Sequence, residues 1–215
     1  TDNNLDEIQD VLKNDQNVII GLTRFDKNKF YNSLANINTK DIKFFDKKIL
    51  VPFGEFLPFR KILNFFEPIS GQYDYTSGKK NRLVEISNNL SYIPIICYEI
   101  IFYWKLLNEN NYNSDFIINI TNDIWFGKYI GPYQHLYLTK LRAAEFKKMI
   151  IRVSNNGISG IINEDGKILI NTNLNTNQNT KYILKVNQNK NFFKIHLYIK
   201  IYFLIIFLFF IIINL

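Results

Sequence analysis

Short apolar runs bounded by turn-forming residues divide this chain into strands and helices. The runs that predict strands lie at 17–21, 30–38, 43–51, 83–86, 93–96, 116–120, 150–153, 159–163 and 167–171. Apolar residues at helical spacing predict helices at 5–13 and 136–149, with a short helix and loop at 56–66. Glu164, Asp165 and Gly166 form a hairpin turn signal between the last two strands. Short strands interleaved with helices favour an α/β sandwich.

The end of the chain has a different pattern. Every residue from 201 to 213 is apolar or aromatic. Extended to 195–215, this segment forms a helix about 31 Å long at about 1.5 Å per residue, enough to cross a hydrocarbon core of about 30 Å. Lys200 can extend its flexible side chain to the membrane interface. We therefore expect a transmembrane helix at 195–215, with a buried core helix as the alternative.

The formal net charge of +7 is compatible with a nucleic acid or a membrane surface as partner. The basic residues are dispersed and no module of interleaved basic and aromatic residues occurs, which argues against nucleic acid. Five lysines instead precede the apolar end, namely Lys181, Lys185, Lys190, Lys194 and Lys200. Each could gain about 1 kcal/mol near anionic lipid, so membrane lipid is the expected partner.

Composition excludes several other classes of protein. With 215 residues, 47% hydrophobic and 21% charged, the chain can bury a sizeable core, so disorder is not expected. The single cysteine, Cys97, cannot form an internal disulfide, and with only His135 and His196 a structural zinc site is not expected. The chain begins with Thr1 and its only methionine is Met149, so we expect it to be the C-terminal piece of a longer protein.

Cys97 is the candidate nucleophile that the residues themselves indicate. It ends a short apolar strand, where its side chain reaches the edge of a sheet, and Glu99 supplies a carboxylate two residues on. A cysteine nucleophile also needs a base that generates the thiolate and a cation that holds the oxyanion. Lys47 is a candidate cation. The plainer interpretations remain open, because a lone cysteine is more often a small hydrophobe and Lys47 fits an ordinary solvated lysine.

Six short segments, in their order and spacing, resemble the apolipoprotein N-acyltransferases, bacterial membrane enzymes whose extracytoplasmic domain belongs to the nitrilase superfamily. The segments are KKILVPFGE at 47–55, ICYEI at 96–100, NDIWFG at 122–127, GPYQH at 131–135, RAAE at 142–145 and NNGI at 155–158. The resemblance covers about 18–215. It implies a nitrilase-like α/β/β/α sandwich over 1–190, incomplete at its N-terminus, and then the transmembrane helix at 195–215.

The resemblance also implies roles for individual residues. Cys97 matches the nucleophile that accepts the acyl chain. Lys47, eight residues before Glu55, matches the lysine that stabilises the tetrahedral oxyanion together with the backbone N–H of Tyr98. Glu55 and Glu99 match supporting carboxylates.

Two further implications concern the entrance and the general base. Trp125 and Phe126 match a loop that borders the lipid-facing entrance, with burial in the core as the alternative. The family's general base is a glutamate in a Trp-Pro-Glu motif upstream of the strand at 18–21, and this triplet does not occur in the chain. We therefore expect the base to lie on preceding sequence, which makes activity of this chain alone doubtful.

The implied activity is apolipoprotein N-acyl transfer, in lipoprotein maturation. An acyl chain passes from a phospholipid to Cys97 as a thioester, and then to the N-terminal amine of a diacylglyceryl-cysteine lipoprotein. The reaction needs no metal or cofactor, and its expected place is the extracytoplasmic face of the bacterial inner membrane. Two alternatives remain, a nitrilase-type amidase that hydrolyses C–N bonds and an inactive truncated remnant in the membrane.

Overall fold

The computed structural model describes residues 2–63, 73–79, 82–87, 90–108, 111–185, 201–207 and 209. Its elements up to residue 171, with η marking 3₁₀ helices, are α1 (Asp2–Asp10), β1 (Asn17–Asp26), β2 (Lys29–Asn38), β3 (Ile42–Asp46), α2 (Arg60–Leu63), β4 (Val84–Ser87), β5 (Leu90–Ile96), η2 (Cys97–Lys105), β6 (Phe116–Asn122), η3 (Asp123–Phe126), α4 (Ile130–Phe146), β7 (Met149–Asn155), β8 (Gly160–Ile162) and β9 (Ile168–Asn171).

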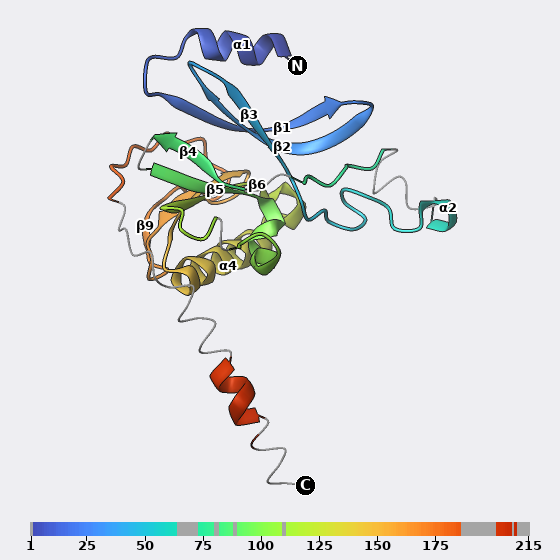
Figure 1. The fold of residues 1–215 in the computed structure, drawn as a ribbon, viewed down its shortest axis with the longest axis vertical. Coiled ribbons are helices and arrows are strands. Elements are labelled where there is room, and N and C mark those ends of the chain that lie inside the picture. Colours follow the sequence, from blue (N-terminus) through green and yellow to red (C-terminus); the bar gives the residue numbers. More distant parts are fainter. Residues whose placement is uncertain are drawn as a thin grey trace.

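These elements form four layers (Figure 1). Helix α1 packs on one face of an antiparallel sheet in the order β1-β2-β3. A six-stranded sheet in the order β4-β5-β6-β7-β8-β9 packs against the other face, and α4 covers its far side. The order of the layers confirms the expected α/β/β/α sandwich.

The central strands are apolar throughout because both of their faces are buried. Along β5, Tyr92 and Ile96 point into the core between the two sheets, whereas Ile93 and Ile95 point into the core beneath α4. Side chains alternate between the faces of a strand, so a strand between two cores needs apolar residues at successive positions. The continuous apolar run at 93–96 is therefore a consequence of the layered fold.

Three parallel strands bring their carboxyl ends to one edge of the larger sheet. Strand β5 pairs with β6 and β6 with β7, with Ile96 opposite Ile120 and Ile120 opposite Val153. The residues that follow these strands therefore lie side by side, and they include Cys97 after β5 and Asp123 after β6. The prediction that Cys97 stands at the carboxyl end of a strand is confirmed.

Two predicted elements differ in extent. The strand expected at 43–51 ends at Asp46. The amide of Lys47 still donates to the carbonyl of Asn32 on β2, but the amides of Lys48 and Ile49 donate to Glu99 and that of Val51 donates to Glu55 instead of to a neighbouring strand. The helix expected at 136–149 begins at Ile130 and ends at Phe146, since Pro132 is tolerated in a first turn and Lys147 adopts a left-handed φ of 51°.

The predicted hairpin at 164–166 is confirmed. Gly166 has a φ of 76° and its N–H donates to the carbonyl of Asn163 at 2.9 Å, which closes the turn between the antiparallel strands β8 and β9. A positive φ at this position suits glycine, which has no side chain to clash.

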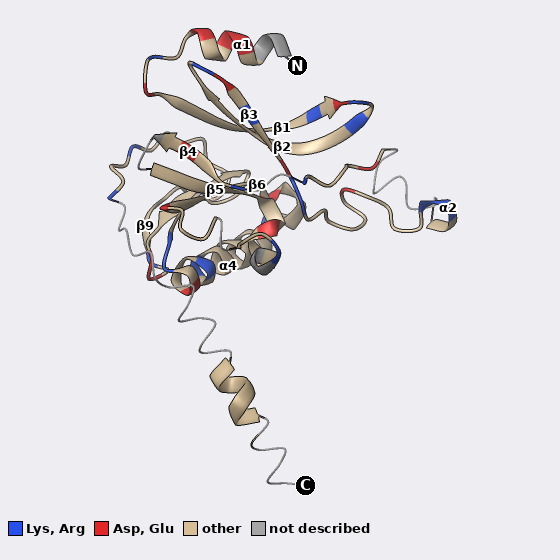
Figure 2. Ribbon diagram, viewed as in Figure 1, with Lys and Arg blue, Asp and Glu red and all other residues tan. Residues whose placement is uncertain are grey.

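The membrane segment expected at 195–215 lies largely outside the described residues. Residues 201–207 form a helix, and within the described part of the chain no helix has the length and apolar character needed to cross a membrane. Of the five lysines before it, Lys181 and Lys185 are described and both are exposed. Figure 2 shows lysine and arginine spread over strands, helices and loops of the sandwich.

Candidate active site

Cys97 stands in a sharp turn between β5 and η2. Its backbone has a φ of 53°, a left-handed conformation that costs a non-glycine residue about 1–3 kcal/mol and persists only where the surroundings impose it. The carbonyl of Cys97 accepts a hydrogen bond from Asn119 Nδ2 at 3.4 Å. The side chain is partly exposed, so the thiol lies at the surface end of the strand. Such a turn presents a nucleophile to a substrate.

Glu99 links the Cys97 turn to the segment that follows β3. Its carboxylate is fully buried and bonds Arg82 Nη1 at 2.6 Å and Nη2 at 2.7 Å. It also accepts from the backbone amides of Ile96, Lys48 and Ile49 at 2.9, 2.6 and 3.0 Å. One carboxylate therefore holds the residue before Cys97 and the residue after Lys47 in fixed positions. The supporting carboxylate expected at 99 acts on backbone and on Arg82.

We expect Glu99→Gln to lower the free energy of unfolding by about 3–5 kcal/mol in urea denaturation, because the buried guanidinium of Arg82 loses its counter-charge. Glu85→Gln is the control, since Glu85 is exposed on β4 and a surface change should stay within about 0.5 kcal/mol. A loss below about 1 kcal/mol for Glu99→Gln would contradict the importance of this ion pair.

Lys47 and Glu55 form a second buried ion pair. Lys47 Nζ lies 2.8 and 2.7 Å from the two carboxylate oxygens of Glu55, and the lysine side chain is 1% exposed. Glu55 also accepts from Asn32 Nδ2 at 2.7 Å and from the amide of Val51 at 2.8 Å. The neighbouring Lys48 side chain is exposed. Of the two adjacent lysines, Lys47 therefore has its ammonium fixed within the protein, as a charge for oxyanion stabilisation would need.

The aromatic residues singled out in the sequence lie in different environments. Trp125 is 69% exposed on η3, so the alternative of a core residue is wrong for it. Phe126 is half-buried and packs edge-on against His135, with ring centroids 5.1 Å apart. Tyr98 is the second residue of η2, and its ring packs against Phe102 at 5.3 Å.

A cavity of about 630 Å³ lies beside the Lys47 segment. Its lining combines the apolar residues Ile49, Leu50 and Phe56 with the cations Lys48 and Lys105, the carboxylate of Asp74, and Tyr75 and Ser77. Lys105 belongs to η2, the helix that begins at Cys97. The cavity thus pairs apolar surface with two cations and one carboxylate, a composition suited to an amphiphile. Among the residues that the structure describes, no three His, Cys, Asp or Glu side chains gather in a way that could hold a metal ion.

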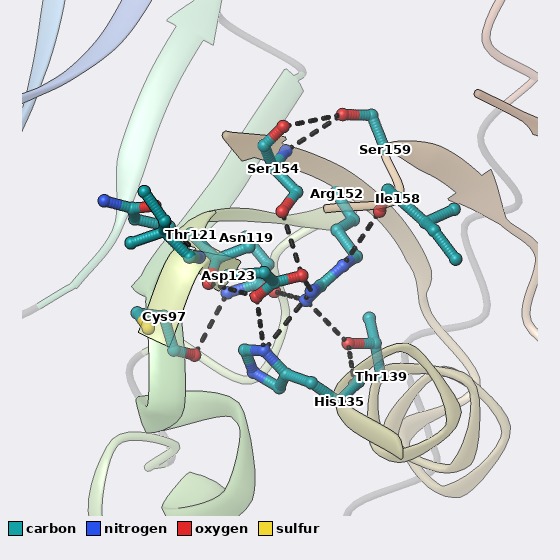
Figure 3. Close-up of polar contacts among 12 residues, drawn as sticks. Cys97, Asn119, Thr121, Asp123, His135, Thr139, Arg152, Ser154, Ile158 and Ser159 are labelled. Atoms are coloured by element: carbon teal, nitrogen blue, oxygen red, sulfur yellow. Dashed lines mark hydrogen bonds and ion pairs between the residues drawn. The ribbon is translucent and has the colours of Figure 1, made fainter. Parts of the chain in front are cut away.

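A buried charged cluster of Arg152, Asp123 and His135 lies behind the Cys97 turn (Figure 3). Arg152 Nη2 donates to Asp123 Oδ2 at 2.6 Å, and both side chains are fully buried. His135 Nδ1 lies 2.9 Å from Asp123 Oδ1. Thr121 and Ser154 hydroxyls donate to the same carboxylate at 3.1 and 2.9 Å. We refer to these three charged or titratable residues as the Arg152 cluster.

Electrostatics set the protonation states of the Arg152 cluster. Burial would raise the pKa of Asp123, but the hydrogen bond from His135 and the charge of Arg152 outweigh it and bring the value to about 2. Burial and the charge of Arg152 together lower the pKa of His135. The favoured state is therefore an ionised Asp123 beside a neutral His135 whose Nδ1–H donates to it. The Nε2 atom of His135 makes no hydrogen bond of standard geometry. The nearby carbonyl of Cys97 acts to raise the pKa of His135, but burial lowers that pKa by more.

Three of the segments quoted above meet at this cluster. Asp123 belongs to NDIWFG, His135 to GPYQH, and Ile158 of NNGI accepts from Arg152 Nε at 3.2 Å. Gly157 of NNGI faces the same carboxylate, where an added Cβ would lie 2.2 Å from Asp123 Oδ2. Glycine at 157 therefore leaves the space that the buried carboxylate fills.

Sequence reasoning missed several residues that hold the site together, namely Asn32, Arg82, Asn119, Asp123, His135 and Arg152. Two of them carried a usable signal. Asn119 and Arg152 are polar residues inside apolar strands, and a buried amide or guanidinium must be paired. Arg82 carried no signal in the sequence, because it follows a polar stretch typical of a loop.

A known family of proteins matches most of this chain. The sequence profile of the carbon-nitrogen hydrolases matches residues 8–187, and the chain belongs to this family. The match includes every element of the sandwich from β1 to β9.

Within that family, the chain is similar to proteins named apolipoprotein N-acyltransferase. It is 42% identical over 151 residues to that of Rickettsia typhi, which covers 69% of this chain and 30% of the relative. It is 36% identical over 175 residues to that of Brucella suis (76% and 33%), and 36% identical over 187 residues to that of Rhizobium leguminosarum (81% and 35%). The chain spans about a third of the length of these relatives.

Solved structures support the fold at low sequence identity. The glutamine-dependent NAD⁺ synthetase of Acinetobacter baumannii matches with a TM-score of 0.63 at 18% identity, over 82% of this chain and 32% of that one. A CN-hydrolase superfamily protein of Xanthomonas campestris matches with a TM-score of 0.55 at 16% identity, over 73% and 58%. These likenesses concern the architecture alone.

Proposed function

We propose that this chain is the C-terminal catalytic part of an apolipoprotein N-acyltransferase. The observation that carries the proposal is the buried Lys47–Glu55 pair, which Glu99 ties to the turn that holds Cys97. A fixed ammonium and a strand-end thiol are the two groups that acyl transfer through a thioester requires. The 36–42% identity to proteins of that name supports acyl transfer over other reactions of the family.

In the first half-reaction, the Cys97 thiolate attacks an ester carbonyl of a phospholipid. The carbon–sulfur bond forms and the carbonyl electrons move to oxygen, where Lys47 and the backbone N–H of Tyr98 stabilise the oxyanion. Collapse expels the lysophospholipid alkoxide, which receives the proton that a general base took from the thiol. We place this base on a glutamate in sequence that precedes residue 1. The protein is left as a Cys97 thioester.

In the second half-reaction, the N-terminal amine of a diacylglyceryl-cysteine lipoprotein attacks the thioester. The carbon–nitrogen bond forms, the carbon–sulfur bond breaks, and Cys97 leaves as the thiolate while the amine loses a proton to the base. The oxyanion passes through the same site as in the first step. The product is an N-acylated lipoprotein, and the order of events is ping-pong.

Both substrates are lipids, which places the reaction at a membrane. The cavity beside the Lys47 segment supports binding of a phospholipid, since its lysines suit a phosphate and its apolar residues suit an acyl chain. The exposed Trp125 suits a lipid interface, where tryptophan is enriched. We propose that residues 195–215 anchor the chain and that the catalytic domain lies on the extracytoplasmic face of the bacterial inner membrane.

The test uses the chain with its natural flanking sequence, in detergent or vesicles, with a fluorescent-acyl phospholipid and a diacylglyceryl lipopeptide. We expect the fluorescent acyl group on the lipopeptide amine by mass spectrometry, and one equivalent on the protein when lipopeptide is omitted. Hydrolysis of simple amides without transfer would replace this proposal with a nitrilase-type amidase. Absence of both reactions would identify an inactive remnant.

A further inference from the structure

The nucleophile turn is joined to the Arg152 cluster through one side chain. Asn119 Nδ2 lies 3.4 Å from the Cys97 carbonyl and 3.3 Å from that of Ile95, while its Oδ1 accepts from Arg152 Nη1 at 3.0 Å. Figure 3 shows this path, from Cys97 through Asn119 to Arg152 and on to Asp123. All of its side chains beyond Cys97 are buried. The side chain of Asn119 therefore links a buried guanidinium to the backbone of the candidate nucleophile.

Arg152 decides which way the Asn119 amide points. A side-chain amide can turn over and exchange its oxygen and nitrogen, and its hydrogen bonds decide between the two orientations. A guanidinium only donates, so its contact holds Oδ1 toward β7 and Nδ2 toward the two carbonyls of the β5 end. These bonds support the left-handed turn at Cys97, which needs support from its surroundings.

Arg152 is itself held in place by groups on other elements. Its Nη2 donates to Asp123 Oδ2 at 2.6 Å, its Nη1 also donates to the Thr139 hydroxyl at 3.2 Å, and its Nε donates to the carbonyl of Ile158. The guanidinium therefore offers Asn119 a donor in a fixed position.

We propose that Arg152 is a positioning residue for Cys97, because it orients the Asn119 amide that holds the nucleophile turn. This inference rests on the proposed function only in taking Cys97 as the nucleophile. It also explains why the apolar strand β7 contains a buried arginine, because burial of a guanidinium is costly in free energy.

The experiment measures the rate of iodoacetamide alkylation of Cys97 at a fixed pH, with the modified peptide identified by mass in the protein with its natural flanking sequence; Cys97 is the single cysteine of this chain. We expect Arg152→Gln to change this rate by about threefold or more, because the thiol loses its fixed position. In the acyl-transfer assay the same variant should lower kcat about tenfold or more, with KM for phospholipid unchanged. A merely structural role would leave the alkylation rate of the folded protein unchanged.

Lys148→Gln is the matched control. Lys148 is also a buried cation, but it precedes β7 at its opposite end, where Nζ donates to the carbonyl of Ser114. We expect its substitution to lower stability without changing the alkylation rate of Cys97. An equal change of that rate in Lys148→Gln, or a folded Arg152→Gln with alkylation rate and kcat within about twofold of the parent, would overturn the proposal.

Asn119→Ala tests the same path and decides the matter if Arg152→Gln does not fold. It removes the bond to the Cys97 carbonyl but keeps the guanidinium, so kcat should fall about tenfold and the alkylation rate should change as in Arg152→Gln. An unchanged kcat would overturn the positioning role. Alkylation needs no acyl donor, so a parent protein without transfer activity but with an Arg152-dependent alkylation rate would refute the proposed function and leave this inference standing.

Discussion

Replacing Cys97 with alanine should abolish acyl transfer, with a loss of about 10⁴-fold or more, because no other thiol of this chain can carry the acyl group. The measurement is labelling of the protein by a fluorescent-acyl phospholipid without acceptor, followed by hydroxylamine, which cleaves thioesters. The parent should carry hydroxylamine-sensitive label and Cys97→Ala none. In the proposed reaction this sulfur alone carries the acyl group between donor and acceptor.

The stability of the variant and its presence in the membrane fraction are the controls for this experiment. Cys97 is partly exposed and its left-handed φ suits alanine no worse than cysteine, so the variant should unfold within about 1 kcal/mol of the parent and remain in the membrane fraction. Label that persists on a folded Cys97→Ala protein would refute the assignment of the nucleophile.

Lys47→Ala should lower kcat by about 10²–10³-fold, the typical cost of removing one donor to an oxyanion. The ammonium of Lys47 is held by both oxygens of Glu55, so its position requires no rearrangement when the oxyanion forms. Single-turnover measurement of thioester formation isolates this step from release of product. Lys48→Ala should change the rate by less than about threefold, because that side chain is exposed.

The two lysines provide a strict comparison, since they are adjacent in sequence and identical in chemistry. Because Lys47→Ala leaves the partly buried Glu55 without its counter-charge, Glu55→Gln serves as a second variant that keeps the lysine but loosens it. Glu55→Gln should lower kcat by an intermediate factor. A greater loss in Lys48→Ala than in Lys47→Ala would show that the assignment is out of register.

Much of the sandwich was predictable because its strands are short, apolar and separated by turn residues. Strand β5 is buried on both faces, so its sequence carries little polar interruption, and the cysteine after it marks the strand end. The prediction that the strand continues from Asp46 to residue 51 was wrong, because the apolar residues of that segment do not belong to a sheet. Apolar residues there, such as Ile49 and Leu50, line a cavity, and the backbone amide of Ile49 is held by the carboxylate of Glu99, which is distant in sequence.

The candidate site was predictable only in part. Cys97 and Lys47 could be singled out from the residues, but the plainer interpretations could not be dismissed. The resemblance to a family then linked Glu55 to Lys47, eight residues apart. The Asn119–Arg152 path could not be predicted in this way, because β6 and β7 are adjacent only in the folded sheet.

The sequence by itself determined the alternation of strands and helices and the placement of one cysteine at a strand end, because hydrophobic periodicity and turn residues act locally. Only the tertiary structure decided which charges are paired. Glu99 meets Arg82 and the backbone beside Lys47, and Asp123, His135 and Arg152 converge from η3, α4 and β7 behind Cys97. Burial makes an unpaired charge costly, so these partners are fixed by the packing of distant segments, which no local pattern records.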